Sequence, residues 1–411
     1  MMKTSPSAIG QDAGHPDVEH AYPSRWFGRV PDRSEARLLL AELAGQPCRA
    51  SAVVPAGPLA IYGAGTFGRM ALDFLRDVGV EPVLVVDARA EQIRGSDAWQ
   101  GIELLAPHEV PDRVKSEALL AVSIVTAPVT PIMEELQGQG WRHVVPFYDV
   151  AESFRPAHPL SNGWFADSLQ PADLVEIAGC LDAWADDLSR AHHLSFLAWR
   201  LARQEWQFAG VPVDNSNRFF IPEVRAALAG GDLFLDGGAH HGSVSAAFLE
   251  ATGPDSRIVA FEPDRASADQ YSAWCASQPE ERRSRIELLR TALDAISRTR
   301  RFHGGLGFMS QFAQSGTQEV LTGTIDAAGI APGFVKLHLE GGELDALKGG
   351  LATFTAARPI LAVTVYHNAD GIWRTAGWLR ENLEGYRLFM RTHSWCGTGA
   401  VIYALPDERM S

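Results

Sequence analysis

The sequence lacks the features that direct a chain into a membrane or an oxidising compartment. No stretch reaches the ~20 consecutive apolar residues of a membrane helix, and residues 1–17 lack the apolar segment of a secretory signal. The 4 cysteines are far apart and form no CxxC pair, which argues against a thiolate zinc site or a disulfide framework. We therefore expect a cytoplasmic protein with no membrane partner.

Positive charge is also scarce. The 411 residues include 36 Lys and Arg against 50 Asp and Glu, which gives a formal net charge of −14. An acidic surface repels phosphate backbones, so the composition argues against a nucleic-acid partner. The hydrophobic fraction of 46% is ordinary for a globular protein, and the length is enough for two or three domains.

Two series of apolar runs alternate with amphipathic segments, which is typical of parallel α/β sheets with right-handed crossovers. We expect a poorly ordered tail to about Arg33 and then a helix over residues 34–44, with Ser34 as its N-cap. A strand is predicted at Leu119–Val125, and a continuous strand at residues 286–293. The last two runs predict an antiparallel hairpin. The predicted parts are a tail and leading helix (1–50), a Rossmann-like domain (51–150), a helical connector (151–230) and a second Rossmann-like domain (231–411).

The first glycine loop follows an apolar run and opens an amphipathic helix. Gly63, Gly65 and Gly68 form a GxGxxG pattern, and Asp87 ends the next apolar run. Such a loop lets backbone N–H groups approach a phosphate, and the acid can accept hydrogen bonds from ribose hydroxyls. The segment resembles the nucleotide-binding domains of sugar-modifying and polysaccharide-biosynthesis proteins. A glycine turn that binds nothing is the alternative. Because no YxxxK pair accompanies the loop, hydride transfer has little support, and a nucleotide-linked substrate or a regulatory nucleotide fits equally well.

A second glycine loop follows the apolar run at residue 233. Asp236, Gly238 and Gly242 form a DxGxxxG pattern, and Glu262 ends the next strand, where its carboxylate can take two ribose hydroxyls. Residues 291–295 follow the third strand and would lie beside the adenine ring of a bound cofactor. The candidate cofactor-binding residues of this half are Asp236, Gly238, Ala239, His240, Gly242, Glu262, Pro263 and Ala292.

Three further motifs follow in order. Thr324-Ile325-Asp326 precedes Lys336-Leu337-His338-Leu339-Glu340-Gly341-Gly342-Glu343, and Leu347 and Gly349 come next. This series resembles the FkbM family of S-adenosylmethionine (SAM)-dependent methyltransferases, which reads TLD, KIDVEGAE and LxG. The resemblance extends over residues 182–404. It implies a class I methyltransferase fold with SAM as cofactor, bound by the candidate residues of the second loop. His338 departs from the pattern, because the family has an acid there.

The candidate acceptor-side residues are His338, Glu340 and His367, which lie at the ends of neighbouring strands. A sugar hydroxyl needs a base or a metal before it can be methylated. His338 or His367 could be the general base, with Glu340 orienting it. In a second interpretation, the three residues bind a divalent metal that lowers the pKa of the acceptor hydroxyl. In a third interpretation, Glu340 and Glu343 hold loop amides and the histidines only line a pocket.

Tryptophans are plentiful in the second half. Three near the C-terminus are candidates for stacking on a sugar, namely Trp373, Trp378 and Trp395. Three others have the helical spacing of core residues, namely Trp184, Trp199 and Trp206.

The function favoured by the sequence is SAM-dependent O-methylation of a hydroxyl on a sugar or related polyhydroxylated metabolite. The acceptor would be a small molecule or a nucleotide-linked sugar, and the first glycine loop would bind a second nucleotide. The alternatives are an NAD(P)-dependent oxidoreductase of nucleotide-linked sugars and a non-catalytic protein that binds a nucleotide or SAM. Metal dependence and homodimer formation stay open.

Overall fold

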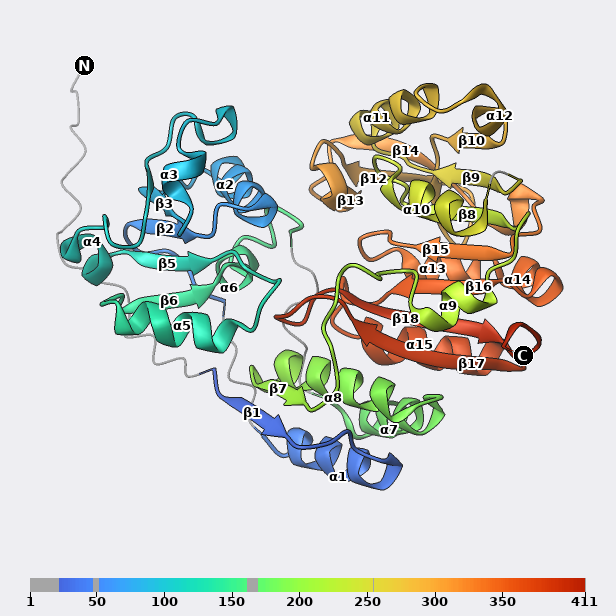
Figure 1. Ribbon diagram of the computed structural model, residues 1–411, viewed down its shortest axis with the longest axis horizontal. Helices are drawn as coiled ribbons and strands as arrows, with labels where there is room; N and C mark the ends of the chain where they lie inside the picture. The colour runs from blue at the N-terminus through green and yellow to red at the C-terminus, as the bar shows by residue number, and fades with distance from the viewer. Residues whose placement is uncertain (1–21, 47–51, 161–168, 254, 411) are drawn as a thin grey trace, which may run out of the picture. The chain divides into compact units, whose positions relative to one another are not determined.

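The computed structural model describes residues 22–46, 52–160, 169–253 and 255–410 (Figure 1). They divide into two compact units. The described part of the first unit is Ala52–Ile124 and Val129–Ser153, and the remaining described residues form the second. Within the described residues, no helix combines the length and the apolar character that crossing a membrane requires.

The first unit is a five-stranded parallel sheet with helical crossovers. Its strands are β2 (Leu59–Tyr62), β3 (Leu84–Val86), β4 (Leu104–Leu105), β5 (Leu119–Val122) and β6 (His143–Pro146). Its helices are α2 (Thr66–Asp77), α3 (Ala90–Ile93), α4 (Asp112–Glu117), α5 (Val129–Gly138) and α6 (Phe147–Glu152), with a 3-10 turn at Asp97–Trp99. Numbered along the chain, the spatial order β4-β3-β2-β5-β6 is 3-2-1-4-5, which matches five of the six strands of a dinucleotide-binding sheet. The strand predicted at Leu119–Val125 ends earlier, at Val122, because residues 125–128 belong to the second unit.

The second unit is built on a seven-stranded sheet. Its strands are β8 (Leu233–Gly237), β9 (Arg257–Phe261), β10 (Ile286–Leu289), β15 (Phe334–Leu337), β16 (Ile360–Thr364), β17 (Tyr386–Thr392) and β18 (Ala400–Pro406). Their order is β10-β9-β8-β15-β16-β18-β17. The first five run parallel, and β18 is antiparallel to both β16 and β17. The predicted α/β fold with a final antiparallel hairpin is therefore confirmed.

Alternate residues of these strands face two separate cores, as the period of two in a strand requires. One core takes Leu235, Val335, Leu337, Leu361, Val363 and Ile402. The other takes Phe234, Phe334, Ile360, Ala362, Val401 and Tyr403. The helices of this part are α9 (Pro222–Ala227), α10 (Ser243–Thr252), α11 (Arg265–Ala276), α12 (Glu280–Arg283), α13 (Glu343–Lys348), α14 (Leu351–Ala357) and α15 (Gly371–Asn382). Two 3-10 turns complete it, at Asp326–Ala328 and Asp407–Arg409.

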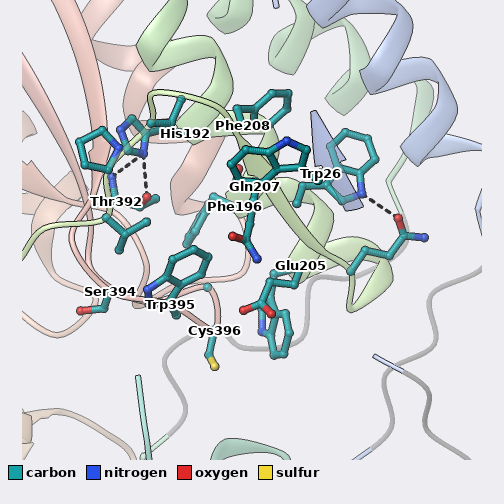
Figure 2. Close-up of a pocket in the computed structure, with 18 of the residues that line it drawn as sticks. Trp26, His192, Phe196, Glu205, Gln207, Phe208, Thr392, Ser394, Trp395 and Cys396 are labelled. Carbon is teal, nitrogen blue, oxygen red and sulfur yellow. Dashed lines mark hydrogen bonds between the residues drawn. The ribbon is translucent and has the colours of Figure 1, made fainter. Parts of the chain in front are cut away.

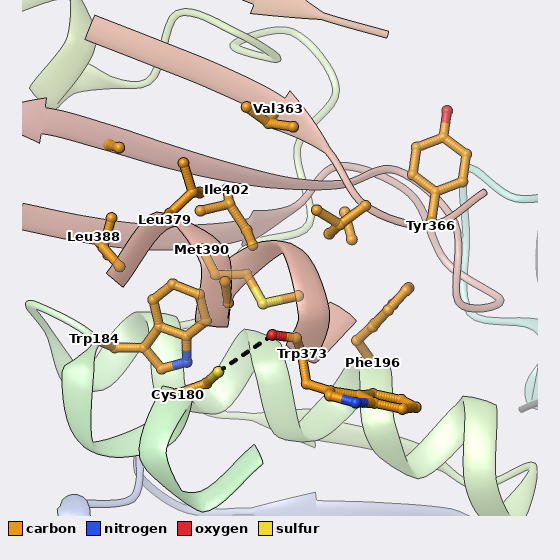
Figure 3. Close-up of a cluster of buried hydrophobic side chains, with 14 of the residues drawn as sticks. Cys180, Trp184, Phe196, Val363, Tyr366, Trp373, Leu379, Leu388, Met390 and Ile402 are labelled. Carbon is orange, nitrogen blue, oxygen red and sulfur yellow. Dashed lines mark hydrogen bonds between the residues drawn. The ribbon is translucent and has the colours of Figure 1, made fainter. Parts of the chain in front are cut away.

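The helices of the predicted connector belong to the first of these cores. They are α7 (Pro171–Ala183) and α8 (Asp187–Ala202), and α1 (Arg33–Ala44) packs on both. Figure 3 draws Trp184, which directly follows α7, Phe196 of α8, Leu388 and Met390 of β17, and Trp373 in one cluster of buried side chains. Trp184 and Trp373 are therefore core residues, and Trp373 is not free to stack on a sugar.

The N-terminal segment contains two corrections. We expected poor order to about Arg33, but Ser24–Phe27 form strand β1, which pairs in parallel with β7 (Glu205–Phe208). Residues 1–21 of the predicted tail lie outside the described residues. The N-cap of α1 is Asp32 rather than Ser34, because Asp32 accepts from the backbone N–H of Glu35 while the Glu35 side chain accepts from that of Asp32.

A small second sheet interrupts the series after β10. The predicted strand over residues 286–293 is two strands, because only β10 pairs with β9. The remainder is β11 (Ala292–Leu293), which pairs with β14 (Gln318–Gly323). Strands β12 (Thr299–His303) and β13 (Gln311–Phe312) complete the sheet, in the order β11-β14-β12-β13, with a 3-10 turn at Gly307–Met309. We call residues 292–323 the ribbon.

Candidate functional site

The first glycine loop joins β2 to α2. Gly63 has a φ of 103°, and a Cβ on Gly68 would lie 1.8 Å from the Gly63 carbonyl oxygen. These two glycines therefore allow the tight turn and the close packing of helix against strand. A Cβ on Gly65 would meet nothing within 4 Å, so this glycine faces open space. Asp87 lies at the loop, where its carboxylate accepts from the backbone N–H of Ala64 at 2.7 Å.

The second glycine loop rests on a buried ion pair. Asp236 is fully buried and contacts Lys336 Nζ at 2.9 Å, and its other oxygen accepts from the Ser245 hydroxyl. Lys336 also donates to the carbonyls of Gly237 and Gly238, at 3.1 and 2.6 Å. Asp236 thus lies beneath the loop and holds Lys336 in the position from which it donates hydrogen bonds to the loop carbonyls.

Packing explains the glycines of this loop. Gly238 has a φ of 75°, and a Cβ there would lie 2.0 Å from the His338 carbonyl oxygen. Gly242 has a φ of 86°, and a Cβ would lie 2.6 Å from the Trp274 ring. Both positions exclude other residues for steric reasons, whatever the loop binds.

Glu262 follows β9 and holds the second loop in place. One carboxylate oxygen accepts from the backbone N–H of His240 at 2.8 Å, and the other from that of Asp264 at 2.9 Å. Burial raises the pKa of Glu262 to about 7, although these two hydrogen bonds act in the opposite direction. His240 has a left-handed backbone, with a φ of 48°, and its ring stacks on His241 at 3.5 Å.

A cavity, which we call the loop cavity, opens between this loop and the ribbon. The predicted residues that line it include Gly238, His240, Glu262, Pro263, Ala292 and His338. Glu340 lines it too, and Phe302, Ser310 and Phe312 of the ribbon close it. Its volume is about 60 Å³, whereas small-molecule pockets usually begin at ~300 Å³, so the cavity in this conformation is smaller than a nucleoside-sized ligand requires. The ribbon is tied down by Asp264, which accepts from Gly305 N–H at 2.6 Å and from the Ser310 hydroxyl at 2.9 Å.

Three acceptor-side residues meet at the ends of β15 and β16. Glu340 Oε1 lies 2.9 Å from His338 Nε2 and 3.2 Å from His367 Nε2. The two imidazole rings stack with centroids 5.0 Å apart. Glu340 has a left-handed backbone, with a φ of 48°, which is strained for a residue other than glycine. We call His338, Glu340 and His367 the cluster.

Glu343 supports the cluster from behind. It is buried, and its Oε1 accepts from Leu339 N–H at 2.9 Å and from the Thr364 hydroxyl at 2.7 Å. The same oxygen lies 2.7 Å from His367 Nδ1. Glu343 therefore holds loop amides, as the third interpretation of the sequence proposes for it, and also fixes the His367 ring.

Burial and charge separate the two histidines. Burial lowers the pKa of His338 to about 3 despite the nearby Glu340. Burial alone would also lower the pKa of His367, but Glu340 and Glu343 outweigh it and raise that pKa well above its ordinary value. Burial acts to raise the pKa of Glu340, and the histidines reverse this and lower it. The two carboxylates therefore favour the charged form of the His367 imidazole, whereas burial favours the neutral form of His338.

A larger cavity, the polar cavity, lies on the other side of the cluster. It has a volume of about 480 Å³ and shares Glu340 and Phe312 with the loop cavity. Its lining includes His367 and a set of polar residues, namely Arg155, Arg300, Gln311, Gln314, Ser315, Asp345 and Asn368. The cluster thus stands where the two cavities adjoin.

A third cavity, of about 450 Å³, has a different lining (Figure 2). Its walls come from α8, β7 and residues 394–397, and its aromatic residues are Trp26, Phe196, Trp199, Trp206, Phe208 and Trp395. Of the residues predicted to contact a ligand, Trp395 lines it, and none of the predicted cofactor-binding or acceptor-side residues does. Trp395 therefore belongs to this cavity and is absent from the lining of the loop and polar cavities.

Several residues of the site were not foreseen. Phe302 and Phe312 come from the ribbon and were not among the predicted site residues. Tyr366 lies 3.2 Å from His338 Nε2 and accepts from Arg218 at 2.8 Å. Tyr366 directly precedes His367, so its place at a strand end was the only available signal. Of the predicted residues, Asp236, Ala239 and Gly242 support the loop without lining the cavity.

Comparison with known proteins gives one match to a family. Residues 236–391 match the sequence model of the methyltransferase FkbM domain. No curated protein gives a significant match.

One solved structure of a known methyltransferase shares the fold. The crystal structure of methyltransferase FkbM from Methylobacillus flagellatus KT is similar over 92% of this chain and 94% of that chain, with 16% identity and a TM-score of 0.57. Precorrin-6y C5,15-methyltransferase from Geobacter metallireducens matches 47% of this chain and 98% of its own, with 16% identity and a TM-score of 0.30. Aeropyrum pernix fibrillarin, solved with S-adenosyl-L-methionine, matches 46% of this chain and 73% of its own, with 12% identity and a TM-score of 0.29. The first likeness concerns the fold, and the other two are too weak to support an argument.

Proposed function

The chain carries a methyltransferase FkbM domain over residues 236–391, and we propose that it transfers the methyl group of SAM to a hydroxyl of a sugar or related polyhydroxylated metabolite. The observation that carries the proposal is the position of the cluster between two cavities. SAM would occupy the loop cavity and the acceptor the polar cavity. The methyl group would then pass beside Glu340, which lines both.

The donor side is supported by the polar groups at the ends of β8 and β9. Glu262 already accepts two backbone N–H groups and retains lone pairs for ribose hydroxyls. Ala292 and the neighbouring Thr291 would lie beside the adenine. Because Gly238 and Gly242 have no side chain, the loop backbone can approach the methionine part of the donor.

The acceptor side is supported by the lining of the polar cavity. Its volume of about 480 Å³ falls within the usual range for small-molecule sites. Arginine, asparagine and glutamine side chains donate hydrogen bonds to hydroxyl oxygens. Arg155 and Arg300 also suit the phosphates of a nucleotide-linked sugar.

The chemistry asked of these residues is mainly positioning. In methyl transfer, the acceptor oxygen forms a bond to the methyl carbon as the carbon–sulfur bond breaks, and that electron pair stays on sulfur. The hydroxyl proton of the acceptor would pass to the cluster, where the neutral imidazole of His338 can take it and release it to water. Holding the two reactants in line accounts for much of the rate enhancement in such reactions.

The test is the binding of S-adenosylhomocysteine, the demethylated product, measured by calorimetry on the full chain. We expect micromolar affinity for the natural chain. Glu262→Ala should weaken it roughly 10- to 100-fold, because hydrogen bonds to a charged group contribute about 1.5–3 kcal/mol each. Glu250→Ala is the control, since Glu250 is exposed on α10. A natural chain that does not bind S-adenosylhomocysteine would refute the proposal.

For the first unit we propose that the glycine loop binds a nucleotide, on the strength of the contact between Asp87 and the loop backbone. Gly65→Ala should weaken binding of NADH or of a uridine diphosphate sugar by at least ~10-fold, because its methyl group would enter the space that a phosphate needs. Thermal stability should not change, since that methyl group meets no protein atom.

Gly68→Ala is the contrasting variant, because its Cβ would collide with the Gly63 carbonyl and destabilise the unit itself. Fluorescence titration with both nucleotides measures the binding. If the natural chain binds neither probe, the loop is only a structural turn. Binding of NADH alone would favour the oxidoreductase alternative for this unit.

A further inference from the structure

Three atoms of the kind that bind metals point to one place. They are His338 Nε2, Glu340 Oε1 and His367 Nε2, and all lie within 4.8 Å of one another. Two histidines and a carboxylate are a common ligand set for first-row transition metals. The residues come from the segments that follow two adjacent strands, β15 and β16, so the sheet itself fixes their spacing.

The His367 ring is held in the orientation that a metal ligand requires. Its Nδ1 lies 2.7 Å from Glu343 Oε1, so Nδ1 carries the proton and Nε2 faces the cluster. A carboxylate behind a histidine is the usual second layer of a metal site, because it fixes the tautomer and makes the ring a better ligand. The Thr364 hydroxyl and Leu339 N–H fix Glu343 in turn.

The other ring nitrogen of His367, Nε2, has no hydrogen bond within the described residues. His367 Nε2 is buried, and the described residues provide no hydrogen-bond partner for it. The side chain is only 2% exposed. Glu340 Oε1 lies 3.2 Å from Nε2, but outside hydrogen-bond geometry. A buried polar atom of this kind is costly unless something binds it.

The spacing fits a coordination shell. Neighbouring ligands of an octahedral ion with bonds of ~2.1 Å lie ~3.0 Å apart. The two observed separations from Glu340 Oε1 are 2.9 and 3.2 Å. Glu340 would thus occupy a corner next to each histidine, and the positions that the protein does not fill would be open to other ligands.

The negative charge of the buried carboxylates also favours a bound cation. Glu340 and Glu343 are both buried, with side chains 7% and 4% exposed. Across the described residues, no lysine or arginine forms an ion pair with either carboxylate, and their charged partners are histidines. A protonated His367 would balance only one of these two buried negative charges, whereas a divalent ion would balance both.

We propose that His338, Glu340 and His367 bind a divalent transition-metal cation of the Mn²⁺, Fe²⁺, Co²⁺ or Zn²⁺ type. Mg²⁺ and Ca²⁺ are poorer candidates, because they prefer sites made of oxygen alone. The catalytic use of the cation rests on the proposed function. A hydroxyl of the acceptor that binds such an ion has a lowered pKa and releases its proton more readily, and an adjacent hydroxyl could bind the same ion.

Metal binding can be tested without any assay of methyl transfer. The full chain is freed of metal with a chelator and titrated with Co²⁺, followed by visible absorption and equilibrium dialysis. We expect about one equivalent bound through imidazole nitrogen. His367→Ala should weaken binding by more than ~100-fold, and Glu343→Gln by roughly 10- to 100-fold, because the latter disturbs only the supporting layer.

His108→Ala is the matched control, because His108 is an exposed histidine of the first unit and its loss should leave Co²⁺ binding unchanged. Thermal melting of each variant shows whether it folds. If His367→Ala does not fold, Glu340→Gln, which keeps the shape and removes the charge, replaces it. A natural chain that takes up no Co²⁺, Mn²⁺ or Zn²⁺ overturns the proposal, and so does uptake that the folded cluster variant retains.

The result for the metal site can be distinguished from the result for the proposed methyl transfer. S-adenosylhomocysteine binding is measured on the same metal-free chain. Cobalt bound by the cluster without S-adenosylhomocysteine binding supports the metal site and refutes the methyl-transfer proposal. S-adenosylhomocysteine binding without cobalt uptake refutes the metal site alone.

Discussion

Replacing Lys336 by methionine should destabilise the second unit by about 3–5 kcal/mol, because it leaves the buried carboxylate of Asp236 without its charged partner. The ammonium group also donates to the carbonyls of Gly237 and Gly238, so the loop would lose its support at the same time. Since whole domains are stable by only about 5–15 kcal/mol, this is a large part of the total. Urea unfolding measures the loss.

Two variants check the cause. Lys348→Met removes an ion pair with Asp345 whose side chains are 47% and 42% exposed, and should cost less than ~1 kcal/mol. Combining Lys336→Met with Asp236→Asn should recover most of the loss, because the buried charge is then gone. If Lys336→Met and Lys348→Met unfold at the same urea concentration, the buried pair is not what supports the loop.

Glu340→Gln should lower kcat by about 10²–10⁴-fold, the range expected when a group that manages proton transfer is lost. The variant keeps the shape of the side chain and removes the charge that both histidines contact. Affinity for S-adenosylhomocysteine should change little, because the polar groups proposed for the donor are on the β8 and β9 side of the cavity. Methyl transfer from labelled SAM, with calorimetry alongside, separates the two quantities.

Glu381→Gln is the control for this experiment, since Glu381 is exposed on α15. A Glu340→Gln chain that turns over at the natural rate would show that the cluster is structural. Equal losses of kcat and donor affinity would instead point to a collapse of the loop cavity.

The donor side could be predicted from the sequence because its signals are local. Gly238 and Glu262 stand at the ends of successive parallel strands, and such ends meet at one edge of a sheet whatever the rest of the chain does. The same reasoning brings His338 and His367 together, because they follow adjacent strands. For these residues the order of the apolar runs along the sequence was enough to predict which strand ends they occupy.

Other features depend on long-range packing that no local pattern records. Residues 286–293 have the composition of one strand, yet the chain changes sheets between Leu289 and Ala292. Asp236 resembles a ligand-binding acid in a glycine motif, but its partner is Lys336, one hundred residues further on. Trp373 has an amphipathic side chain suited to a sugar, but the helices packed around it make it part of the core (Figure 3).

The ribbon determines how fast the loop cavity can exchange its contents. Phe302 and Phe312 close that cavity, and Asp264 ties the segment down through Gly305 and Ser310. If SAM binds in the loop cavity as proposed, its entry would require those two hydrogen bonds to break. Its association rate would then fall below the usual ~10⁵–10⁷ M⁻¹s⁻¹. The same closure would slow the departure of the spent donor, so turnover would be timed by the opening of the ribbon rather than by the transfer step.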